Sequence, residues 1–176
     1  MTGTPTPILN ATNSMVTVDE AGLFFSGRLW TDAWDVSDSA TKQKALVMAT
    51  RDVDAMTFMG SKADTTQPHA FPRTFTSAPA MDASTYYHPS GMFSEDGIQQ
   101  YAKDAVCEQA LWLLQQTPYE VHRARQMAQG VASTGTGSAS ESYAPAAVNL
   151  ARHGRTMSPD AIRILAPVLA VAGDLV

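Results

Sequence analysis

Residues 44–56 read KALVMATRDVDAM, and this stretch decides the class of the fold. Its apolar residues recur at steps of three and four, which places them on one face of an α-helix: Leu46, Ala49, Val53 and Met56. The helix is expected to begin at Ser37 or Ser39 and to be closed by Gly60, because glycine is common just past a helix C-terminus. A mainly helical protein is therefore the first prediction.

Helix signals also lie on either side of this stretch. Thr17 is an N-cap residue type, and the acidic residues Asp19 and Glu20 follow it, so a short helix is expected over 18–25. Trp30 and Trp34 are expected in a turn-rich link between the two helices.

The second half of the chain predicts three more helices. Ser94 has the same N-cap signature and opens a long apolar helix, which Pro118 ends. Pro118 also suits the first turn of a following helix, which runs to about Ala128. Ser158 and Pro159 begin a C-terminal helix over 158–171, and Pro167 is expected to kink or shorten it.

Three segments lack the helical period. Residues 1–14 are rich in Thr, Pro and Asn and predict an extended N-terminal arm. Residues 61–94 contain several prolines and aromatic residues and predict a long ordered loop. Residues 131–143, VASTGTGSASESY, predict a β-hairpin that turns near residues 135–137. The expected fold is a single domain over 1–176: a helical bundle of four to five helices with a protruding β-hairpin or extended segment and a long loop.

Composition excludes several classes of protein. With 176 residues and 44% apolar content, the chain can bury a core without metal or disulfide support. No apolar run reaches the roughly 20 residues needed to cross a bilayer, so no membrane partner is expected. The N-terminus lacks a signal-peptide pattern, so we expect a soluble, unprocessed protein. A net charge of −5 disfavours a dedicated nucleic-acid binder, and Cys107 is expected to be a buried, inert thiol.

No motif predicts catalysis. The histidines His69, His88, His122 and His153 stand far apart and show no metal-ligand spacing, so surface or hydrogen-bonded histidines are expected. The glycines of 135–138 are not followed by the lysine of a phosphate loop. We therefore expect a protein that is not an enzyme and has no cofactor, no metal site and no catalytic residue.

Two segments are candidates for protein contacts. A hairpin of small residues has open strand edges that a neighbouring subunit could cover. The candidate subunit contacts are Val131, Ser133, Thr134, Gly135, Thr136, Gly137, Ser138 and Tyr143. The candidate partner loop contains Phe71, Pro72, Arg73, Phe75, Tyr86 and Tyr87. For this loop a second interpretation stays open, in which its rings fold back onto the bundle.

Several motifs together resemble the family of phage head-tail connector or adaptor proteins, some of which carry the label of DnaT-like single-stranded DNA-binding proteins. The resemblance begins with MVTVDEA at 15–21 and is most specific in KALVMATRDVD at 44–54. It continues with Phe71-Pro72-Arg73, although Phe71 stands where tryptophan is usual. It also covers the small-residue segment from Gly130 to Tyr143.

The resemblance implies a function as well as a fold. Such proteins are helical bundles that form a ring, expected to be dodecameric, below the portal protein of the capsid. The next neck or tail-terminator protein would bind the other side of the ring, and DNA would pass through the centre without specific binding. The expected location is the virion neck, with host cytoplasm during assembly. The alternative is a single-stranded DNA-binding replication accessory protein, which would need a basic groove with stacking aromatic residues.

Overall fold

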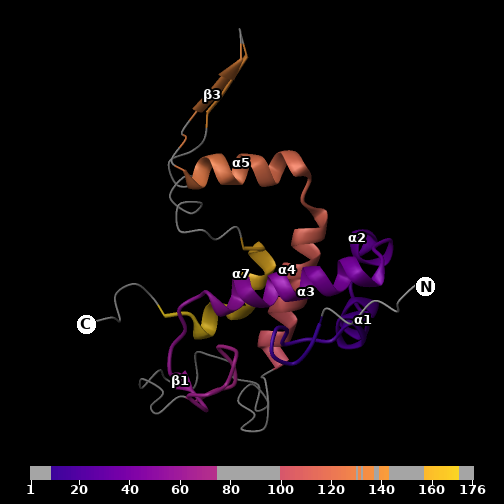
Figure 1. Cartoon of the computed structure of the whole chain (residues 1–176), viewed down its shortest axis with the longest axis vertical. Coiled ribbons are helices and arrows are strands. Elements are labelled where there is room, and N and C mark those ends of the chain that lie inside the picture. The colour runs from indigo at the N-terminus through magenta and orange to yellow at the C-terminus, as the bar shows by residue number, and fades with distance from the viewer. Residues whose placement is uncertain are drawn as a thin grey trace, which may run out of the picture.

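In the computed structural model, the chain forms a packed helical body from which one helix and a β-hairpin project (Figure 1). The structure describes residues 9–74, 100–129, 131, 133–136, 139–142 and 157–170. Six α-helices lie in these residues, together with one short 3-10 helix and two pairs of strands. The prediction of a mainly α fold with a small hairpin is confirmed. In the described part of the chain, no helix is both long and apolar enough to span a membrane.

Helix α1 spans Val18–Ser26 and helix α2 spans Asp32–Asp35. Thr17 is the N-cap of α1 as predicted: its hydroxyl accepts from the Glu20 N–H, while the Glu20 carboxylate accepts from the Thr17 N–H at 2.8 Å. This reciprocal capping box satisfies two backbone donors that a helix start leaves open. Helix α2 was not predicted, because Trp34 and its neighbours are too few to show a period; Trp34 is buried against Phe25.

Helix α3, over Ser39–Asp54, is the helix that residues 44–56 predicted. Its N-cap is Asp38, whose carboxylate accepts from the Thr41 N–H at 2.7 Å. The prediction that Gly60 closes this helix is wrong, since α3 ends at Asp54 with Ala55 as its C-cap. Gly60 instead has a φ of 70°, a left-handed value that glycine adopts without strain, and it precedes a short strand.

Helix α4, over Gln100–Gln115, is the centre of the body and packs against both α3 and α7. Three of its alanines are fully buried, which lets the neighbouring helix backbones approach closely: Ala102, Ala105 and Ala110. Cys107 is also buried, as predicted, and burial raises the pKa of its thiol. The start of this helix at Ser94 lies outside the described residues.

Helix α7 covers Pro159–Leu165, and the 3-10 helix η1 covers Ala166–Val168. Ser158 caps α7 and Pro159 occupies its first turn, as predicted. The predicted range 158–171 is too long, because the helix tightens into η1 at Pro167, a residue that cannot donate an α-helical hydrogen bond. After η1 the chain pairs with residues 57–59: the Met59 N–H donates to the Val168 carbonyl at 2.9 Å.

Residues 9–14 differ from the extended arm that we expected. They form a hydrogen-bonded turn in which the Ser14 N–H donates to the Asn10 carbonyl at 3.0 Å, and Ser14 is buried. The Leu9 N–H donates to the side chain of Gln43 on α3. This hydrogen bond holds the turn to α3, since a backbone N–H that is removed from water needs an acceptor in the protein. Residues 1–8 lie outside the described part.

The first part of the predicted loop folds back onto the body. Strands β1 (Ser61–Lys62) and β2 (Arg73–Thr74) pair in antiparallel fashion. Between them Phe71 is only 1% exposed, and its ring lies 4.7 Å from that of Phe58 and 5.5 Å from that of Tyr101, centroid to centroid. Both contacts are edge-to-face, an arrangement that aromatic pairs favour.

Tyr101 provides a simple test of this aromatic cluster. Among the described residues its buried hydroxyl has no hydrogen-bond partner, and burial raises the pKa of Tyr101 to about 12 against the opposing effect of Arg73. Tyr101→Phe removes this unsatisfied group while keeping the ring contact with Phe71. We expect the free energy of unfolding in urea to stay the same or to rise by up to about 1 kcal/mol. A loss above about 1 kcal/mol would show that the hydroxyl has a partner in the folded protein.

Candidate interaction surface

The hairpin of strands β3 (Ser133–Thr136) and β4 (Ala139–Ser142) is the part of the described chain that extends furthest from the body (Figure 1). Thr136 is opposite Ala139 and Ser133 is opposite Ser142. Gly135, which the sequence placed near the turn, belongs to β3, and residues 137–138 lie outside the described residues. Helix α5 (Pro118–Ala128) connects the hairpin to α4.

The register identifies the outward-facing backbone groups of the hairpin. In a two-residue hairpin the residues that flank the turn form a hydrogen-bonded pair, and such pairs alternate along the ladder. Thr136–Ala139 and Thr134–Glu141 are then the bonded pairs. Ser133, Gly135, Ser140 and Ser142 direct their N–H and C=O groups to the two outer edges, and no third strand among the described residues pairs with this sheet. Both edges can accept a further strand.

The candidate subunit contacts are therefore placed only in part. Val131 is half-buried, and its N–H donates to the Gln126 carbonyl at 3.0 Å. Ser133 and Gly135 are exposed on β3, and Thr134 and Thr136 belong to the same strand. Gly137, Ser138 and Tyr143 lie outside the described residues.

The candidate partner loop is also placed only in part. Phe71 is in the core, so its ring is not presented to a partner, and the described part of the loop favours the folded-back interpretation. Arg73 donates to backbone carbonyls around it: Nε to Met59 at 2.8 Å and Nη2 to Gly60 at 2.6 Å. Phe75, Tyr86 and Tyr87 lie outside the described residues.

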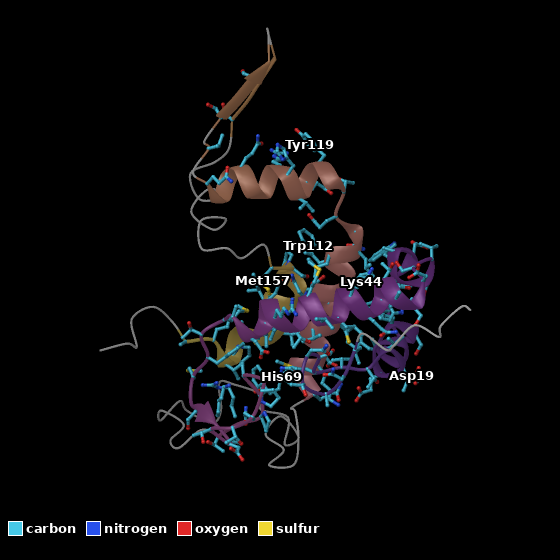
Figure 2. The ribbon with its side chains drawn as sticks, in the orientation of Figure 1. Asp19, Lys44, His69, Trp112, Tyr119 and Met157 are labelled. Atoms are coloured by element: carbon cyan, nitrogen blue, oxygen red, sulfur yellow. The ribbon has the colours of Figure 1, made fainter. Side chains whose placement is uncertain are left out.

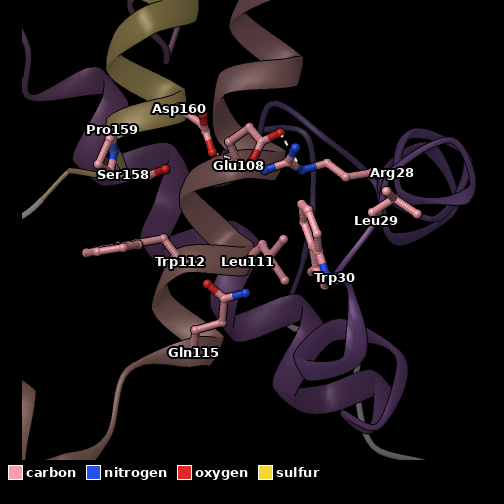
Figure 3. Close-up of a pocket in the computed structure, with 10 residues that line it drawn as sticks. All are labelled: Arg28, Leu29, Trp30, Glu108, Leu111, Trp112, Gln115, Ser158, Pro159 and Asp160. Atoms are coloured by element: carbon pink, nitrogen blue, oxygen red, sulfur yellow. Dashed lines mark hydrogen bonds and ion pairs between the residues drawn. The ribbon is translucent and has the colours of Figure 1, made fainter.

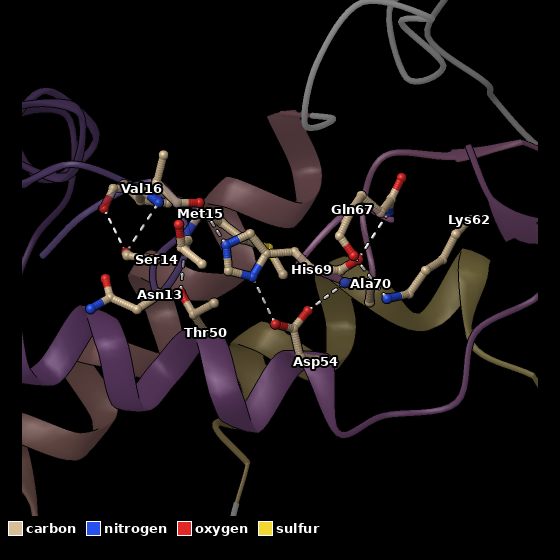
Figure 4. Close-up of polar contacts among 12 residues, drawn as sticks. Asn13, Ser14, Met15, Val16, Thr50, Asp54, Lys62, Gln67, His69 and Ala70 are labelled. Atoms are coloured by element: carbon tan, nitrogen blue, oxygen red, sulfur yellow. Dashed lines mark hydrogen bonds and ion pairs between the residues drawn. The ribbon is translucent and has the colours of Figure 1, made fainter. Parts of the chain in front are cut away.

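His69 and Asp54 fasten the N-terminal turn to the end of α3 (Figure 4). The Nδ1 atom of His69 lies 2.9 Å from Asp54 Oδ2, and its Nε2 lies 3.1 Å from the Ala11 carbonyl. The other Asp54 oxygen accepts from the Ala70 N–H at 2.6 Å. His69 is thus a buried, hydrogen-bonded histidine, one of the two outcomes expected for this residue type. Both hydrogen-bond partners of the His69 ring, Asp54 and the Ala11 carbonyl, belong to the same chain.

Gln109 on α4 joins three elements of the body. It is completely buried; its Nε2 donates to Asp52 Oδ2 at 2.7 Å, and its Oε1 accepts from the Ser158 N–H at 2.7 Å. Burial raises the pKa of the Asp52 carboxyl, and the hydrogen bond from Gln109 opposes this effect. Gln109 was not predicted as a contact residue, because a glutamine within an apolar helical stretch carries no distinguishing pattern.

Two substitutions of Gln109 test its hydrogen bonds, and the effect of the second on the free energy of unfolding depends on pH. Gln109→Leu leaves the Ser158 N–H and the Asp52 carboxylate without their partner, so we expect a loss of about 2–3 kcal/mol in the free energy of unfolding. Gln109→Glu puts a second carboxyl beside Asp52, which raises one pKa of the pair in the folded state.

A group whose pKa is higher in the folded state stabilises the fold at low pH, and this contribution is lost as pH rises. Gln109→Glu should therefore approach wild-type stability near pH 4 and fall below it at pH 7. Urea denaturation at both pH values measures this. Equal losses at the two pH values would contradict the placement of Gln109 against Asp52.

A pocket of about 230 Å³ lies between the α1–α2 link and helix α4 (Figure 3). Arg28 crosses it: Nε is 2.8 Å from Glu108 Oε1 and Nη2 is 3.1 Å from Asp160 Oδ2. Burial raises the pKa of Glu108, and Arg28 opposes the shift. Arg28 therefore pairs with both Glu108 and Asp160. Among the described residues, no three His, Cys, Asp or Glu side chains gather in a way that could hold a metal ion.

Fold and surface define the chain as a small, mainly helical protein with a projecting β-hairpin. It belongs to the family described as "Putative DnaT-like ssDNA binding protein", whose sequence model matches residues 3–175. No curated protein and no solved structure matches the chain.

Proposed function

We propose that this chain is a structural, non-enzymatic adaptor of the neck of a tailed bacteriophage. Copies of it form a ring, expected to be dodecameric, between the portal protein and the next neck or tail-terminator protein. DNA passes through the ring without being bound specifically. The protein assembles in the host cytoplasm and ends in the virion.

One observation carries this proposal: in the described part of the chain, a hairpin whose two edges have no further strand stands clear of the body. Open edges expose unpaired backbone groups and invite aggregation of a monomer, whereas a ring covers them with a neighbour at every position. The resemblance to head-tail connector proteins in the sequence supports the same function. A net charge of −5 suits a channel through which DNA slides, because acidic surfaces do not hold phosphates.

Single-stranded DNA binding is the second candidate function. The family description supports it more directly than it supports the adaptor, since it names single-stranded DNA and no virion component. The sequence of helix α5 also contains Arg123 and Arg125, and its Tyr119 is exposed, a combination that can contact a nucleic-acid strand. Against it, residues 133–142 contain no Lys, no Arg and no aromatic residue, so the hairpin offers neither charge nor stacking to bases.

A pair of measurements separates the two candidates. Mass measurement of the purified chain alone and with the portal protein should show a ring-sized particle. Titration with a labelled single-stranded oligonucleotide at 150 mM salt should show no tight binding. A monomer with or without the portal protein would contradict the adaptor. Tight binding that weakens steeply with salt would establish the second candidate instead.

A further inference from the structure

The segment Thr17–Asp38, here called the α1–α2 corner, exposes an unusual number of large apolar side chains. They are Leu23, Leu29, Trp30 and Val36. Trp30 is 79% exposed and Leu29 is 72% exposed, although both line the 230 Å³ pocket on α4. Large apolar side chains that are exposed at a hollow, as Leu29 and Trp30 are, are typical of a protein contact.

Trp30 also has a strained backbone. Its φ is 59°, a left-handed value that a bulky residue rarely adopts. Such a conformation persists only where the surroundings impose it, and it is most common at sites that bind. Figure 3 shows Trp30 beside Leu111 on one side of α4, while Trp112 extends from the other side of that helix. The strain fixes a tryptophan at the edge of the hollow, where it can act as an anchor.

The charge of the corner indicates what binds there. Thr17–Asp38 contains the acidic residues Asp19, Glu20, Asp32, Asp35 and Asp38, of which Glu20 is paired with Lys103 on α4. Its one basic residue, Arg28, is paired with Glu108 and Asp160, which belong to α4 and α7. A partner with a basic and partly apolar surface is therefore complementary.

Helix α5 of the same sequence has this character. It carries Arg123, Arg125 and His122 against one acidic residue, Glu120. Two of its apolar side chains, Tyr119 and Val121, are exposed. Within one copy α5 lies well apart from α1 and α2 (Figure 1), and Figure 2 shows Tyr119 away from the packed body. One copy thus presents both halves of a complementary contact at separate places.

We propose that helix α5 of a second copy docks on the α1–α2 corner, with Trp30 as its anchor. This inference rests on the proposed ring and assigns the two faces of its repeated contact. Two different surfaces that meet head to tail generate a ring when the rotation closes. The hairpin, which continues from α5, would then reach the same neighbour.

Cross-linking of two single-cysteine exchanges tests the contact. Leu29→Cys and Val121→Cys proteins, which keep Trp30 and Tyr119, are mixed and treated with a short bismaleimide; the native Cys107 is buried and should not react. The expected result is a cross-linked dimer in the mixture and little dimer in either variant alone. Dimer from Leu29→Cys alone would mean that two corners face each other and would overturn the proposal, as would a mixture that oligomerises without cross-linking.

Charge exchange provides an independent test. Arg123→Glu with Arg125→Glu should weaken self-association at least tenfold, as should Asp32→Arg with Asp35→Arg, and mixing the two double variants should recover part of it. Circular dichroism checks that each remains folded. Oligomers of unchanged size in both variants would overturn this contact but leave the ring intact. A wild-type chain that stays monomeric would overturn both. If the wild-type chain bound single-stranded DNA and the α5 variant lost this binding but kept its oligomers, α5 would belong to a nucleic-acid contact and the proposal would be overturned.

Discussion

Replacing residues 131–143 with a four-residue Gly-Ser linker should leave the helical body folded and abolish assembly into rings. Among the residues whose burial the structure describes, the buried core lies in the segments 14–71, 101–111 and 157–168, and none of these buried residues belongs to the hairpin. We expect the free energy of unfolding in urea to change by no more than it does for ordinary surface substitutions, about 0.5 kcal/mol. When the linker variant is mixed with the portal protein, the variant should keep the mass of a monomer and should form no ring-sized particle.

Ser140→Pro is the matched control for the role of the hairpin edge. Ser140 is opposite Gly135, a position where the N–H is expected to point outward, so proline should leave the internal ladder intact and block addition of a strand. Thr134→Pro would instead break the ladder itself. If Ser140→Pro assembles normally while the linker variant does not, the hairpin acts through its side chains or its length rather than through its open edge.

Phe71→Ala should give the largest loss of stability of any substitution considered, about 3–5 kcal/mol in the free energy of unfolding. The ring is almost fully buried between Phe58 and Tyr101, and it connects the β1–β2 segment to α4. Removing it leaves a cavity that its rigid neighbours cannot fill. Urea denaturation followed by circular dichroism measures the loss.

Phe71→Leu keeps much of the apolar volume and should lose only about 1–2 kcal/mol. The difference between the two variants distinguishes a packed core residue from a surface contact. If Phe71→Ala kept wild-type stability but lost binding to a neck partner, Phe71 would belong to the partner loop instead.

The described helices other than α2 were predictable because their signals are local. The Thr17 capping box, the apolar face of α3, Pro118 and the Ser158–Pro159 start all act within one or two turns of the chain. The hairpin was predictable for the same reason, since its small residues and glycines fall within 13 positions, 131–143.

The contacts that join distant segments were not predictable. Gln109 meets Asp52 and Ser158 across gaps of 57 and 49 residues, and His69 meets Ala11 across 58. The burial of Phe71 and the exposure of Trp30 likewise depend on where other elements pack. Sequence spacing carries no information on such pairs, so the loop and the α1–α2 corner had to come from the structure.

Electron microscopy of particles made by a phage that lacks this chain tests the adaptor function most directly. The account predicts DNA-packaged or emptied heads that carry no tail, together with free tails, and rescue by the wild-type chain but not by the linker variant. Heads joined normally to tails in the absence of the chain would contradict the account.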